Sequence, residues 1–109
     1  MKNNDILKTS LKKVRWPAGV KVIGDSQFMD FKALEEIELP DTLTSIGASA
    51  FFHCTSLKDI TLPDSLTAIG AKAFYQCTGL TSITIPESTK SISTNAFEGC
   101  DNLTINKAG

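Results

Sequence analysis

Three cysteines and a single histidine carry the most reactive side chains of this 109-residue chain. Cys54, Cys77 and Cys100 follow one another at intervals of 23 residues, and His53 directly precedes the first of them. Zinc sites use clustered ligands such as Cys-x-x-Cys, and the sequence contains no such cluster. Glycine-rich phosphate loops and the Gly-x-Ser-x-Gly motif of serine hydrolases are also absent. We therefore expect no catalytic residue, no metal site and no cofactor.

The interval between the cysteines recurs throughout the chain. A short apolar phrase ending in proline occurs four times, at Pro17, Pro40, Pro63 and Pro86. Three further columns keep the same interval: isoleucine at 23, 46, 69 and 92, phenylalanine at 28, 51, 74 and 97, and leucine at 11, 34, 57, 80 and 103. A fixed period of this length, with Leu and Ile at strand-like spacing, predicts a solenoid whose units stack on one another.

Each unit is expected to have three short sides. In residues 57–62, Ile60 and Leu62 alternate inward across Thr61, which is typical of a half-buried strand, and Pro63 ends it. The second side is the shorter run 66–69, closed by Gly70. The third side, 71–76, suits one helical turn of 3₁₀ type. The predicted fold is a repeat solenoid, mainly β with short 3₁₀ or helical turns.

The repeat divides the chain into four coils, 14–36, 37–59, 60–82 and 83–105. Residues 1–13 are expected to form an N-terminal cap or partial coil, with a short amphipathic helix or half-coil from Asp5. Residues 106–109 are expected to form a C-terminal tail. Asn106 and Ala108 stand one period after Ile83 and Ile85, so the inward columns are predicted to become polar or small, as a terminal unit requires.

The repeated unit reads Ile-x-Leu-Pro-Asp-x-Leu-x-x-Ile-Gly-x-x-Ala-Phe-x-x-Cys-x-x-Leu, nearly letter for letter in 37–59 and 60–82. This unit closely resembles the BspA-like (Treponema pallidum type) leucine-rich repeat. The resemblance implies a right-handed coil of about four units with a parallel sheet on one face. Members of the family are mostly surface or secreted proteins of bacteria and some protists, implicated in adhesion. The resemblance therefore implies a bacterial, surface-located or secreted protein-binding module, but no binding residues, because the consensus letters are core and corners.

Composition restricts the partners. The formal net charge of −1 argues against nucleic acids and anionic membranes, which both favour basic proteins. No apolar run approaches the roughly 18 residues that span a bilayer, so membrane insertion is not expected. The first residues lack the apolar region of a signal peptide. If this start is native, the chain is expected to be cytoplasmic.

The cysteine column is interpreted as part of the core. Phe31 occupies its position in the first coil, so the cysteines are expected to face inward as small apolar side chains. Stacked coils lie about 4.8 Å apart with parallel side chains, which disfavours disulfide geometry. We therefore predict three buried, reduced thiols. His53 precedes an inward cysteine and is expected to point outward.

Two surfaces are candidates for contacts. The outward columns of the strand face place basic residues of the first coil beside acidic residues of the second, which indicates cross-strand charge pairs and threonine ladders. The alternative interpretation is a recognition surface on the sheet face formed by Glu36, Glu38, Asp59, Thr61 and Thr84. On the third side, Met29, Phe52 and Tyr75 share one repeat position, and Glu98 ends the row. This row either lies flat over the coil edge or marks a contact.

The function expected from these features is non-enzymatic protein binding or adhesion, with a host or microbial surface protein as partner. The alternative is a structural fragment or a small self-associating repeat protein with no dedicated ligand site. In that case, the apolar row and the open end of the solenoid would form a homo-oligomer.

Overall fold

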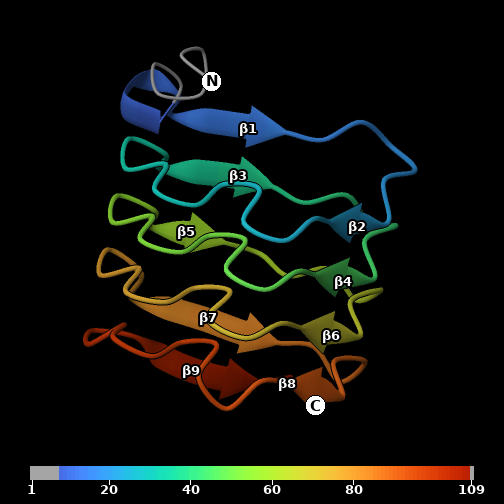
Figure 1. Ribbon diagram of the computed structural model, residues 1–109. Coiled ribbons are helices and arrows are strands. Elements are labelled where there is room, and N and C mark those ends of the chain that lie inside the picture. The colour runs from blue at the N-terminus through green and yellow to red at the C-terminus, as the bar shows by residue number, and fades with distance from the viewer. Residues whose placement is uncertain (1–7, 109) are drawn as a thin grey trace.

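The computed structural model describes residues 8–108 and shows a parallel β-solenoid of about four turns (Figure 1). One side of each coil carries a strand of the first series: β1 (Lys13–Arg15), β3 (Glu36–Glu38), β5 (Asp59–Ile60), β7 (Ser82–Ile85) and β9 (Thr104–Lys107). The next side carries two-residue strands: β2 (Val22–Ile23), β4 (Ser45–Ile46), β6 (Ala68–Ile69) and β8 (Ser91–Ile92). The predicted solenoid is confirmed.

Two strands of the first series, β3 and β7, show the predicted alternation of buried and exposed residues. In β7, Ile83 and Ile85 are buried, whereas Ser82 and Thr84 are exposed. In β3, Ile37 is buried between two exposed glutamates. In β3 and β7, one face of the strand therefore packs on the core and the other is at the surface, whereas all four residues of β9 are exposed.

The two-residue strands form a second parallel ladder, β2-β4-β6-β8, where the sequence predicted a sheet on one face only. Ile23 lies opposite Ile46, and Ile46 lies opposite Ile69, so the constant period also aligns this part of the backbone. Threonine side chains extend the ladder. The Thr67 hydroxyl donates to the carbonyl of Thr44 at 2.9 Å, and the Thr44 hydroxyl donates to the carbonyl of Lys21 at 3.1 Å.

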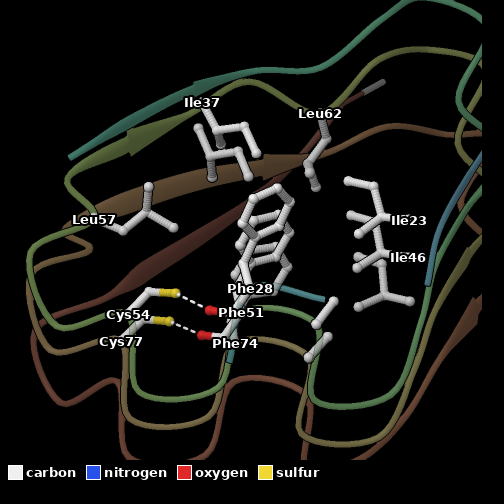
Figure 2. Close-up of a cluster of buried hydrophobic side chains, with 14 of the residues drawn as sticks. Ile23, Phe28, Ile37, Ile46, Phe51, Cys54, Leu57, Leu62, Phe74 and Cys77 are labelled. Carbon is white, nitrogen blue, oxygen red and sulfur yellow. Dashed lines mark hydrogen bonds between the residues drawn. The ribbon is translucent and has the colours of Figure 1, made fainter. Parts of the chain in front are cut away.

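The phenylalanine column forms the centre of the core (Figure 2). The rings of Phe28, Phe51, Phe74 and Phe97 stack with centroid separations of 5.5, 5.2 and 5.3 Å and interplanar angles of 6–8°. Phe51 and Phe74 are fully buried, as the repeat predicted. The isoleucine and leucine columns pack on either side of this stack.

The third side of each coil is a series of turns and not a single 3₁₀ turn. Ser26 and Asp30 have φ values of 59° and 63°, in the left-handed region that interrupts a helix. As a result, N–H groups can point along the stack. The N–H groups of Ser26, Phe28 and Asp30 donate to Ala48, Ala50 and Phe52 of the next coil at 2.7–2.9 Å. The turns therefore connect neighbouring coils in the manner of a ladder.

The C-terminal strand corrects one predicted register. Ile105 lies opposite Ile83 and Asn106 lies opposite Thr84, so the prediction that Asn106 replaces Ile83 was wrong. Ile83 follows Leu80 by three positions, but Ile105 follows Leu103 by only two. The missing residue shifts the strand by one position. Ile105 therefore falls in an apolar column, although it is 49% exposed on β9.

The N-terminal cap is described only in part. Residues 8–10 are helical, and most of the predicted short helix or half-coil lies outside the described residues. At the other end, Asn106 and Lys107 belong to β9.

Candidate functional site

Two aromatic residues of the predicted contact row stack directly on each other. The rings of Phe52 and Tyr75 are 4.8 Å apart at 17°, and both side chains are half-buried. The His53 ring lies 4.3 Å from Phe52 and 5.9 Å from Tyr75. We call the surface formed by Phe52, His53 and Tyr75 the aromatic ledge. The structure thus brings two of the three predicted row residues together with a third ring.

The turns explain how the ledge is positioned. Phe51 and Phe74 point into the core, and the next residue in each coil, Phe52 or Tyr75, points toward the surface. The left-handed φ of 61° at His53 then returns the chain toward the buried Cys54. Because these residues occupy the same positions in successive coils, their rings meet at the spacing of the stack. Met29 is half-buried at the same position one coil earlier, and Glu98 is exposed at the other end of the row.

Charged groups flank the ledge on two sides. The Lys72 ammonium lies 5.2 Å from the centroid of the Tyr75 ring, a cation–π geometry. Asp30 Oδ1 lies 3.3 Å from His53 Nδ1. Sequence reasoning missed both His53 and Lys72 as members of the site. The interval of 23 residues between Asp30 and His53 was the available signal for their contact.

The sheet-face candidates separate into two groups. Glu36 Oε1 lies 3.5 Å from Lys13 Nζ, and Glu38 Oε1 lies 3.2 Å from Arg15 Nε, so the predicted cross-strand charge pairing is confirmed at these positions. All four side chains are more than half exposed, and such pairs contribute at most about 1 kcal/mol each.

The second group is Thr61 and Thr84, which are exposed and line one groove between β5 and β7. Asp59 lies opposite Glu36 in the β3–β5 pairing, and its side chain is outside what the structure describes. Thr61 follows β5 directly, so that strand is shorter than the predicted one.

The cysteine thiols have a structural role in the core. Cys54 Sγ donates to the carbonyl of Phe28 at 3.1 Å, and Cys77 Sγ donates to that of Phe51 at 3.0 Å (Figure 2). Burial raises the pKa of Cys54 to about 12. The neighbouring Cys100 thiol, together with burial, raises the pKa of Cys77. Protonated thiols are poor nucleophiles. Cys100 is only half-buried, so the prediction of full burial holds for two of the three thiols.

Within residues 8–108, no group of three or more His, Cys, Asp and Glu side chains is placed to hold a metal ion. The same part of the chain has no helix with the length and apolar character required to cross a membrane.

Solved structures of leucine-rich repeat proteins share this fold. The leucine-rich repeat protein of T. pallidum is 38% identical, with a TM-score of 0.84, over 85% of this chain and 44% of that one. A leucine-rich repeat protein from Bacteroides ovatus is 34% identical, with a TM-score of 0.79, over 89% of this chain and 25% of that one. A leucine-rich cell surface protein from Faecalibacterium prausnitzii is 30% identical, with a TM-score of 0.65, over 89% of this chain and 32% of that one. The chain therefore matches less than half the length of each of these proteins.

The family model agrees with the structural comparison. Among curated proteins, none is similar enough to match. The model of the BspA type leucine-rich repeat region, however, matches residues 3–107 in six copies. The repeated columns, the parallel ladders and this match over nearly the whole length lead to one conclusion: the chain belongs to the BspA-type leucine-rich repeat family.

Proposed function

We propose that this chain is a non-enzymatic protein-binding module that contacts its partner through the aromatic ledge. The observation that carries the proposal is the stacked, half-buried pair Phe52 and Tyr75 at the surface. Large aromatic side chains dominate the energetics of protein interfaces. The fully buried Phe51 and Phe74 directly behind them hold the ledge in place, so little conformational entropy is lost on binding.

The chemistry of the ledge favours an oxygen-rich contact. The facing surfaces of Phe52 and Tyr75 are occupied by their own stacking, so a partner meets mainly the ring edges. Ring edges carry positive partial charge, and the Lys72 ammonium adds a full positive charge beside them. On the Tyr75 side, carbonyl and carboxylate groups of a protein partner complement this surface, whereas the Asp30 carboxylate beside His53 disfavours an anion at the other end.

A protein of a host or microbial surface is the partner class that we propose. The F. prausnitzii neighbour is described as a cell surface protein, and this supports a surface or secreted location in a bacterium for the present chain. The second candidate is self-association. Self-association is favoured by the exposed Ile105 on β9. Among the described strands, β9 pairs only with β7, so its other edge is open.

Light scattering of the chain, alone and with a panel of extracellular-matrix proteins, tests both functions. The double variant Phe52→Ser and Tyr75→Ser should weaken complex formation at least tenfold without changing the melting temperature by more than a few degrees, because neither side chain is part of the buried core.

The matched control reverses the charges of Glu36 and Glu38 to Lys on the sheet face. This control should change the salt dependence of binding and leave the affinity in physiological salt close to that of the unaltered chain. The opposite pattern, in which the Ser variant binds normally and the Lys variant does not, would place the contact on the sheet. Scattering that rises with concentration in the absence of any partner would favour self-association.

A further inference from the structure

The strand ladder of the first series is interrupted at one place. β1, β3 and β5 form one ladder and β7 and β9 form another, but β5 and β7 are not hydrogen-bonded neighbours. They remain adjacent in the stack (Figure 1). On the second side, the same two coils pair normally through β6 and β8. The two coils are therefore joined on one side and separated on the other.

A groove of about 440 Å³ lies at this interruption. Ile60, Leu62 and Ile83 lie at its floor, but they are only 7%, 6% and 2% exposed and belong to the core, so the floor offers little apolar surface. Exposed hydroxyl side chains line it from both coils, with a carboxylate nearby: Thr61, Ser82, Thr84 and Asp64. Since β5 and β7 do not pair with each other, their facing backbone edges offer further donors and acceptors to whatever occupies the groove.

The groove continues around the corner of the coil. A second hollow of about 380 Å³ is lined by Asp64, Glu87, Ser88 and Ala108, and it shares Asp64 and Ala108 with the first. The volume of each hollow is within the range of small-molecule sites, and the shared residues make the whole site elongated.

We propose that this split between β5 and β7, which we call the strand groove, binds a neutral oligosaccharide. A sugar ring presents hydroxyl groups around its edge. The threonine and serine hydroxyls of the groove both donate to and accept from sugar hydroxyls. The carboxylates of Asp64 and Glu87 only accept hydrogen bonds, and the hydroxyl groups of a sugar can donate to them. The elongated shape suits more than one sugar unit.

The strand groove and the aromatic ledge lie on different sides of the coil, so their occupants need not compete. Thr61, Ser82 and Thr84 belong to the strand side, whereas Phe52 and Tyr75 belong to the turn side. Oligosaccharide binding therefore goes beyond the proposed protein contact, and loss of one function does not imply loss of the other.

The test is an NMR titration of the ¹⁵N-labelled chain with maltotriose, cellotriose and chitotriose, and separately with trilysine. At least one trisaccharide should shift the amide peaks of residues 82–85 in a saturable manner. The double variant Ser82→Ala and Thr84→Val should weaken that binding tenfold or more, because it removes two hydroxyls and keeps the strand propensity of position 84.

The matched control is Thr104→Val, which removes an exposed hydroxyl opposite Ser82 on β9, outside the strand groove. It should bind as the unaltered chain does, and both variants should keep the original melting temperature within a few degrees. The proposal is overturned if none of the trisaccharides shifts these peaks, or if the double variant binds as tightly as the control. It is equally overturned if trilysine alone binds, since that would make the site a cation site.

Discussion

At the residue scale, the most consequential feature is the left-handed position that closes each turn segment. Asp30, His53 and Gln76 occupy it with φ values of 63°, 61° and 55°, and Gly99 occupies it in the last coil with 81°. Left-handed backbone conformations cost non-glycine residues roughly 1 kcal/mol, least for Asp and Asn. The position is retained because it directs the backbone donors toward the next coil.

Replacing Gln76 with Gly should therefore raise the free energy of unfolding by roughly 0.5–1 kcal/mol, because glycine adopts this conformation without steric cost. Urea denaturation measures the change. The reverse substitution, Gly99→Ala, is the control and should be destabilising, since a Cβ there would lie against the side chain of Gln76. A loss of stability in Gln76→Gly would mean that the Gln side chain contributes more than the strain removes.

The burial of Cys54 makes stability depend on pH. Its pKa is raised from 9.0 to about 12 in the folded chain, so between these values the folded state holds a proton that the unfolded state has lost. The stabilisation that this thiol contributes is present in full well below pH 9. It decreases as the pH rises, and the free energy of unfolding falls by about 2 kcal/mol between pH 8 and 10.5. Urea melts at both pH values should show this loss in the unaltered chain.

The variant Cys54→Ala isolates the contribution of this thiol. Its stability at pH 8 should be lower because a buried group is removed, but its further loss on going to pH 10.5 should be smaller by about 2 kcal/mol. An equal loss in both chains would show that the thiol does not titrate differently in the folded and unfolded states.

At the element scale, the coils are held together by stacked columns. Phe74 is fully buried and has a parallel phenylalanine on each side, whereas Phe97 is half-buried and stacks on Phe74. Phe28 lies near the end of the column but still has three ring neighbours: it contacts Trp16 and Phe31 edge-on and stacks on Phe51. The loss of stability on removing a ring should therefore depend on how many rings it contacts and how deeply it is buried, and not only on its distance from the chain ends.

Phe74→Ala should lower the free energy of unfolding by about 3–5 kcal/mol, as expected for a large ring removed from a packed core. Phe97→Ala is the matched comparison and should cost clearly less, because part of its ring is already exposed. Denaturant melts of the two variants measure the difference. Equal losses would contradict the view that coils gain stability mainly from close neighbours on both sides.

At the scale of the whole molecule, the solenoid is continuous along some sides and divided along another. The second ladder runs through β2, β4, β6 and β8 without interruption, and the phenylalanine stack runs beside it. The ladder of the first series divides between β5 and β7. The molecule can tolerate this division because its coils are already held by the other columns, and the division leaves a groove that an unbroken sheet would not have.

Much of this architecture could be predicted because the period alone specifies it. Residues such as Ile23, Ile46 and Ile69 recur at one interval, so stacking them in register buries all of them at once. The same logic placed the phenylalanine column, the inward cysteines and the charge pairs Lys13–Glu36 and Arg15–Glu38.

What only the tertiary structure decided depends on contacts between coils. The sequence by itself determined the repeat, the core columns and the exposed row, since each needs only an interval and a residue type. The left-handed turns and the second ladder depend on where backbone donors point. The single-residue shift at Ile105, the position of Lys72 over Tyr75 and the opening between β5 and β7 depend on distances across the stack. Such distances are not encoded in any one unit, because identical units can stack with or without a hydrogen bond between them.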